Sequence, residues 1–112
     1  MKVVLDTNFL DIPFNYGVDV FEQLLGYELY TIQECADELQ RVNPAAVRLM
    51  VSKGVKVVKQ TFKSRTVDDR LIDFAAENGA NIATVDKGLL SKAQKRGIPC
   101  LTLVRGRHVE RI

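Results

Sequence analysis

Short apolar runs rich in valine and isoleucine alternate along this chain with segments whose apolar residues recur at helical spacing. The strand-like runs are residues 3–5, 28–32, 55–58, 81–84 and 99–104. The predicted helices are residues 18–25, 33–42, 45–52, 67–78 and 86–96, with residues 11–17 as a loop. Strands that alternate with helices form a parallel sheet covered on both faces. We therefore predict an α/β fold, a three-layer α/β/α sandwich with a mainly parallel five-stranded sheet.

The composition favours one globular domain spanning residues 1–112. Hydrophobic residues make up 46% of the chain and charged residues 27%, which is ordinary for a soluble protein. No apolar run approaches the roughly 18 residues that span a membrane, and a strand near residue 3 leaves no room for a secretory signal. Cys35 and Cys100 lack zinc-site spacing and are expected to be small buried hydrophobes. We expect a cytoplasmic protein with no membrane partner.

The first strand, Val3-Val4-Leu5, is apolar at consecutive positions, as strands buried on both faces are. Asp6 follows it directly and is therefore placed at the carboxyl end of the strand, where open α/β sheets bind their ligands. The alternative is structural, because Asp6 or Asn8 could simply cap the following turn. This stretch alone leaves both interpretations open.

Three further acids occupy comparable positions. Asp86 follows the fourth strand, and Glu38 falls at the border of the apolar stripe of its helix. At about 100° per residue, Asp68 falls at the centre of the apolar stripe of helix 67–78, while Asp69 falls toward the edge. That stripe is predicted to consist of Leu71, Ile72, Ala75 and Ala76. Each acid on its own is also explained as a helix cap, a first-turn acid or a solvated side chain.

Four acids from four separate segments are expected to converge, because the carboxyl ends of parallel strands meet at one edge of the sheet. They are Asp6, Glu38, Asp68 and Asp86. Crowded carboxylates repel one another and raise each other's proton affinity unless a cation lies among them. Ligands that offer only oxygen suit Mg²⁺ or Mn²⁺. Such ions activate water and offset charge on the leaving oxygen, so the pattern predicts metal-dependent phosphodiester hydrolysis.

Four short motifs carry a family resemblance. In order they are Asp6-Thr7-Asn8, Glu38-Leu39, Asp68 followed by Gly79, and Thr84-Val85-Asp86. Together they resemble the PIN domain nucleases over nearly the whole chain. The resemblance implies a metal-dependent endonuclease acting on single-stranded or structured RNA with Mg²⁺ or Mn²⁺. It also implies metal-binding roles for Asp6, Glu38, Asp68 and Asp86, with Asn8 and Thr84 as supporting polar groups.

The paired acids Asp68 and Asp69 make the third acid of the motif ambiguous, and Asp69 is assigned a supporting role. The closing portion, through residues 107–111, is most similar to the branch that contains pre-ribosomal RNA processing endonucleases and small archaeal relatives. The VapC-like toxin branch is the second choice. RNA is the expected partner, while a homodimer, an antitoxin or a ribosome-processing partner stays open. The competing interpretation is a catalytically silent PIN-like binding module or scaffold in RNA processing.

Basic and aromatic side chains provide candidates for contacts with RNA. Lys87 follows Asp86 near the predicted rim, and Lys63 and Arg65 precede the Asp68 helix, so these three are favoured for phosphate binding. Further basic candidates are Lys92, Lys95, Arg96, Arg105 and Arg107. The aromatic candidates for base stacking, which could equally pack into the core or a dimer interface, are Phe9, Phe14 and Tyr16. His108 is expected to be a surface or partner-contact residue.

Overall fold

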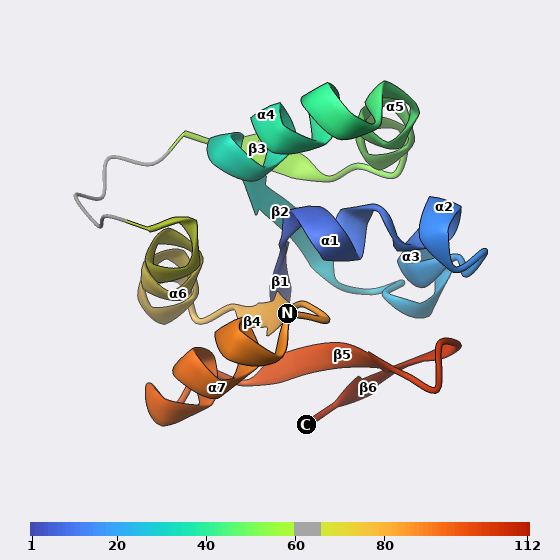
Figure 1. The fold of residues 1–112 in the computed structure, drawn as a ribbon. Coiled ribbons are helices and arrows are strands. Elements are labelled where there is room, and N and C mark those ends of the chain that lie inside the picture. Colours follow the sequence, from blue (N-terminus) through green and yellow to red (C-terminus); the bar gives the residue numbers. More distant parts are fainter. Residues whose placement is uncertain (60–65) are drawn as a thin grey trace.

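The structure, a computed structural model, describes residues 1–59 and 66–112. Its strands are β1 (Lys2–Leu5), β2 (Glu28–Ile32), β3 (Lys56–Val58), β4 (Asn81–Ala83), β5 (Cys100–Val104) and β6 (His108–Arg111). They form one sheet in the order β3-β2-β1-β4-β5-β6, in which every neighbouring pair is parallel except β5 and β6 (Figure 1). The predicted α/β class and mainly parallel sheet are confirmed.

The sheet has a sixth strand where the sequence predicted only five. A tight turn after β5 carries two residues of positive φ, Arg105 at 57° and Gly106 at 67°, and returns the chain antiparallel as β6. In β6 only Val109 is partly covered, while His108, Glu110 and Arg111 are exposed. An edge strand needs few apolar residues, so the alternation that marks a strand in a sequence is nearly absent here.

Seven helices occur in the described part of the chain. They are α1 (Thr7–Leu10), α2 (Ile12–Asn15), α3 (Val20–Gln23), α4 (Gln33–Val42), α5 (Pro44–Ser52), α6 (Val67–Asn78) and α7 (Lys87–Lys95). The predicted bounds of α4 and α6 are confirmed, whereas the helix predicted over residues 18–25 is only the single turn α3. The predicted loop over residues 11–17 contains α2, because Pro13 stands in the first turn, where its missing N–H costs no hydrogen bond. None of these helices has the length and apolar character needed to cross a bilayer.

The core lies on both faces of the sheet. Val3 and Leu5 of β1 pack into a cluster with residues of α1 to α5, whereas Val4 packs into a second cluster with residues of α6 and α7. All three side chains are fully buried, because successive residues of a strand point to opposite faces. The chain is thus a three-layer α/β/α sandwich, with β1 at its centre and the carboxyl ends of β1 and β4 at one edge (Figure 1).

Candidate active site

The register of β1 and β4 places two polar side chains together. Leu5 pairs with Ala83, so Asp6 and Thr84 leave the sheet side by side, and the Asp6 N–H donates to the Ala83 carbonyl at 3.2 Å. Both side chains are buried. The Thr84 hydroxyl donates to Asp6 Oδ2 and accepts from the Asp86 N–H at 3.0 Å. Thr84 therefore links the acid that follows β1 to the backbone of the acid that follows β4.

A pocket of about 170 Å³ opens at this edge of the sheet. It is lined by Asp6, Thr7, Asn8, Cys35, Glu38, Val67, Asp68, Leu71 and Asp86. The four acids predicted to converge therefore meet here, and we call this cavity the acidic pocket. Asp6 is buried and Asp68 half-buried, while Glu38 and Asp86 are exposed, together with the predicted supporting residue Asn8. The other predicted supporting residue, Thr84, holds Asp6 through its hydroxyl.

Two of these acids are also helix N-caps, as the structural interpretation of the sequence predicted. Asp6 Oδ1 accepts from the Phe9 N–H at 2.8 Å, and Asp86 Oδ1 accepts from the N–H groups of Gly88 at 2.8 Å and Leu89 at 3.2 Å. Capping satisfies the free N–H groups at a helix start and occupies Oδ1 of each carboxylate. It fixes each carboxylate relative to the pocket, so the capping and site interpretations are compatible.

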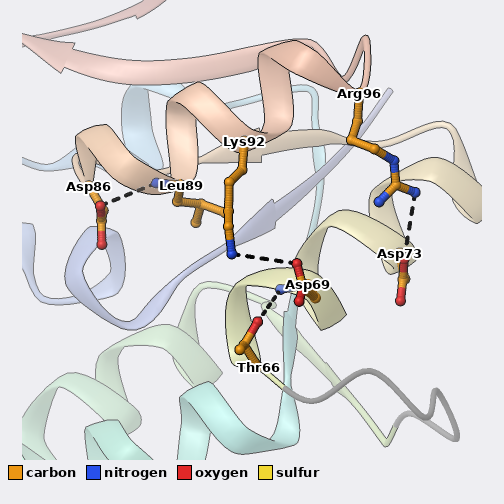
Figure 2. A network of polar contacts seen from close by, with 7 residues as sticks. All are labelled: Thr66, Asp69, Asp73, Asp86, Leu89, Lys92 and Arg96. Carbon is orange, nitrogen blue, oxygen red and sulfur yellow. Dashed lines mark hydrogen bonds and ion pairs between the residues drawn. The ribbon is translucent and has the colours of Figure 1, made fainter.

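The paired acids of α6 point in different directions. Asp68 lines the acidic pocket, whereas Asp69 Oδ1 lies 3.6 Å from Lys92 Nζ on α7 (Figure 2). One turn further along, Asp73 pairs with Arg96 at 3.7 Å. The predicted apolar stripe was wrong in one member, because Ala76 is exposed and Phe74 takes its place in the core. Alanine is as suited to an exposed helix position as to a buried one, so it marks the buried face poorly.

The acidic pocket is short of positive charge. Among residues 1–59 and 66–112, no ion pair involves any of its four carboxylates. The pKa of Asp6 is raised to about 6, chiefly by burial and also by repulsion from Asp86 and Asp68, while the hydrogen bonds from Thr84 and Phe9 oppose the shift. Burial, and then Asp86, likewise raise the pKa of Asp68, while Lys92 lowers it. A cation in the pocket would relieve this repulsion.

The donor chemistry of the pocket fits a hydrated hard cation. Within the described part of the chain, no three His, Cys, Asp or Glu side chains form a group that could hold an ion directly. The carboxylates instead surround an open pocket, and Mg²⁺ typically keeps several waters and takes only one or two protein carboxylates. Burial raises the pKa of the Cys35 thiol to about 11, so the thiol stays neutral and the pocket offers no thiolate ligand for a metal. Oxygen ligands from Asp6, Glu38, Asp68 and Asp86 remain.

Comparison with known proteins gives a family that agrees with this geometry. The sequence matches the family described as "PIN like domain" over residues 3–107. The chain belongs to the PIN-like domain family. The structure of the PIN domain endonuclease Utp24 is similar to it, with 25% identity, a TM-score of 0.82, and coverage of 99% of this chain and 92% of Utp24.

A PilT N-terminus domain protein from the hyperthermophilic archaeon Sulfolobus solfataricus P2 shares the fold, with a TM-score of 0.73 and 16% identity, over 91% of this chain and 87% of that protein. No curated protein matches the chain. The predicted family is confirmed, and the likeness to Utp24 spans nearly the whole of both chains.

Among the described residues, the remaining candidates of this PIN-like domain do not line the acidic pocket. Lys87 is exposed at the start of α7, next to Asp86, and Lys63 and Arg65 lie outside the described residues. Of the aromatic candidates, Phe9 is fully buried in the core, so it cannot stack on a base. Phe14 and Tyr16 are exposed, as is His108 on β6.

Two buried hydroxyls that the sequence analysis missed brace the pocket of this PIN-like domain. The Thr31 hydroxyl of β2 donates to the Leu5 carbonyl at 2.8 Å, and the Thr7 hydroxyl donates to the Cys35 carbonyl at 3.4 Å. These bonds tie the carboxyl end of β1 to β2 and α4. For Thr31 the available signal was a threonine between apolar neighbours in a predicted strand, since a buried hydroxyl needs an internal partner.

Proposed function

We propose that this PIN-like domain is a metal-dependent endoribonuclease, with residues 1–112 acting as one catalytic domain. The observation that carries the proposal is the acidic pocket, in which carboxylates from four segments meet without an ion-pair partner in the described part of the chain. Uncompensated buried carboxylates are costly for a fold and are typical of functional sites. Similarity to the endonuclease Utp24 supports nuclease chemistry.

The residues proposed to hold Mg²⁺ or Mn²⁺ are Asp6, Glu38, Asp68 and Asp86. When bound, such an ion activates water and stabilises the charge that develops on the leaving oxygen. Thr84 keeps Asp6 in position through its hydroxyl and supports Asp86 through the backbone. Asn8, exposed at the pocket, offers an amide group to a phosphate oxygen. Asp69 serves from outside the pocket by holding α6 against α7.

RNA is the proposed substrate and an RNA-processing assembly the proposed partner. The resemblance of the closing segment to RNA-processing endonucleases supports this choice, as does the likeness to Utp24. Lys87 is proposed to contact a phosphate beside the cleaved bond, which its exposure and its position next to Asp86 in the chain support. Lys63 and Arg65 are proposed as further phosphate contacts on the strength of the sequence alone.

Cleavage of an end-labelled single-stranded RNA tests the proposal. We expect products with Mg²⁺ or Mn²⁺, none with chelator, and none with an Asp6→Asn variant purified in parallel. Products that persist in chelator would contradict the metal mechanism. RNA binding without cleavage in either metal would instead favour the silent binding module, and fluorescence anisotropy with the same RNA measures that binding.

A further inference from the structure

A second pocket lies beside the acidic one. It has a volume of about 370 Å³, and its lining includes Tyr16, Val85, Lys87, Leu90, Leu103 and Gly106. We call it the base pocket. Val85 and Lys87 flank Asp86, which lines the acidic pocket, so the segment that follows β4 forms part of both cavities. A ligand that lies across this segment would reach both.

One wall of the base pocket is an exposed aromatic ring. Tyr16 ends α2 and is 53% exposed, although its backbone N–H is fixed by a 2.8 Å hydrogen bond to the Ile12 carbonyl. The ring lies against the β5–β6 turn, since a Cβ built on Gly106 would be 3.8 Å from Tyr16 Cδ2. The ring therefore has a defined place, and more than half of the residue is open to solvent.

The β5–β6 turn against which Tyr16 lies is held by the side chain of Gln23. Gln23 of α3 donates from Nε2 to the Arg107 carbonyl at 2.8 Å and accepts at Oε1 from the Val109 N–H at 2.7 Å. Both bonds fix the β6 side of the turn that carries Gly106. Arg105 and Arg107 flank Gly106 in the chain and are exposed, and Lys87 lines the pocket. The pocket thus combines apolar side chains, an aromatic ring and the lining cation Lys87, and two exposed arginines adjoin its lining residue Gly106 in the chain.

We propose that the base pocket binds the base of one unpaired nucleotide next to the cleaved phosphodiester, with Tyr16 stacking on it. The position of that nucleotide relative to the cleaved bond rests on the proposed function. Every base has an apolar face that stacks on aromatic rings, while its flanking phosphates attract lysine and arginine. Lys87, together with the exposed Arg105 and Arg107 next to Gly106, matches the charge of those phosphates. A base held in a duplex is stacked on its neighbours and cannot enter, so the cleaved segment is single-stranded at this nucleotide.

An abasic scan tests the proposal. A single-stranded RNA with one abasic nucleotide, moved stepwise past the cleavage site, is cleaved by the wild type and by Tyr16→Ala, Tyr16→Phe and Phe14→Ala. Phe14 is the matched control, because it is an exposed aromatic of α2, 49% exposed, that does not line the base pocket. We expect an abasic nucleotide at one position to lower kcat/KM by about 5- to 140-fold, the range given by stacking of one base.

The decrease in kcat/KM caused by the abasic nucleotide should persist in Tyr16→Phe and Phe14→Ala. It should vanish in Tyr16→Ala, because we expect this variant to cleave intact RNA with a kcat/KM that is already reduced by a similar factor. An equal abasic loss in Tyr16→Ala and the wild type would overturn the proposal. So would the absence of a position-specific loss in the wild type.

Binding without cleavage separates this proposal from the nuclease assignment. Anisotropy of the same RNAs with Ca²⁺ in place of Mg²⁺ needs no turnover, and we expect the same Tyr16-dependent abasic effect on Kd. If that effect appears while no metal supports cleavage, the base pocket stands and the nuclease proposal fails. If RNA is cleaved but Tyr16→Ala changes neither Kd nor kcat/KM, the base pocket is wrong. A Tyr16→Ala variant that alters only the sedimentation of the protein would mark a contact between protein copies and overturn the proposal.

Discussion

Asp68 and Asp69 are neighbours in the chain but belong to two regions with opposite electrostatics. Asp68 lines the acidic pocket, where the described residues provide no ion-pair partner, and its pKa is raised by burial. Asp69 belongs to a surface between α6 and α7 that we call the outer face, where Asp69 pairs with Lys92 of α7 and Asp73 pairs with Arg96, the residue after α7 (Figure 2). The same residue type therefore adds to the repulsion in one region and joins two helices in the other.

Ionised carboxylates contribute to the stability of the fold with opposite sign in the two regions. Ion pairs as exposed as Asp69 with Lys92 contribute about 0–1 kcal/mol to folding. Asp6, which is 6% exposed and has its pKa raised to about 6, instead destabilises the folded protein when it is ionised. A buried carboxylate without a counter-charge gives the fold no stability from its charge. For this reason the acidic pocket, and not the outer face, supports a functional assignment.

The largest expected effect is on RNA cleavage, when each of the two acids is replaced by asparagine in turn. Asp68→Asn should lower kcat/KM for RNA by more than about 100-fold, because a metal ligand supplies several kcal/mol of charge stabilisation. Asp69→Asn should lower it by at most about tenfold, through a shift of α6 against α7. Cleavage rates of both variants with Mn²⁺ give the comparison. An inactive Asp69→Asn together with a normal Asp68→Asn would reverse the assignment of the third acid.

The stability of the metal-free protein should depend on pH through Asp6. Its pKa is about 6 in the fold and about 3.9 when unfolded, so the folded state binds the proton more tightly. The stabilisation by this proton is complete below about pH 4 and is lost as pH rises through about 6, with a limit on the order of 3 kcal/mol. Urea denaturation in chelator should therefore show a higher free energy of unfolding at pH 5 than at pH 8.

Two variants sharpen this test. Asp6→Asn should flatten the pH dependence between 5 and 8, since it removes the titrating carboxyl but keeps its size. Asp69→Asn should retain it, because Asp69 lies in the paired region. A wild type that is equally stable at both pH values would mean that Asp6 is not held in an unfavourable environment.

Divalent metal should stabilise the protein through the acidic pocket only. An ion that binds the folded state alone stabilises it by about 2.7 kcal/mol at one hundred times its Kd. We expect Mn²⁺ to raise the Tm of the wild type and of Asp69→Asn in scanning calorimetry, and to leave that of Asp68→Asn nearly unchanged. Equal Tm increases in all three proteins would place the ion away from the acidic pocket.

The sequence predicted the pocket better than the contacts around it. Helix α6 was located from its apolar spacing and from Gly79, whose φ of 62° ends the helix, so the direction of Asp68 followed from helix geometry alone. The partner of Asp69 did not follow, because Lys92 lies on another helix and only the packing of α6 on α7 brings the two together. Spacing within an element can be derived from local rules, while contacts between elements require the fold.

The same limit applies to the base pocket. Tyr16 was an aromatic candidate in the sequence, and Phe9 was an equal one, yet Phe9 is buried in the core. What distinguishes Tyr16 is the β5–β6 turn, which depends on a sixth strand that the sequence pattern did not reveal. An edge strand with one partly covered apolar residue leaves too weak a periodic signal to be predicted.

The smallest expected effect is the coupling between Asp69 and Lys92. Their side chains are 42% and 51% exposed, so solvent screens the pair, and a double-mutant cycle of Asp69→Asn with Lys92→Met should give about 0.5 kcal/mol. Urea denaturation of the four proteins measures it, and the coupling should shrink further at 1 M salt, where the screening length is about 3 Å. Lys92 also lowers the pKa of Asp68, so its positive charge acts on the acidic pocket, and Lys92→Met should slightly strengthen Mn²⁺ stabilisation because it removes a cation near the site. A coupling above about 2 kcal/mol, or one that salt does not reduce, would show that the outer face is not an ordinary solvated surface, and the contrast between the two regions would then be lost.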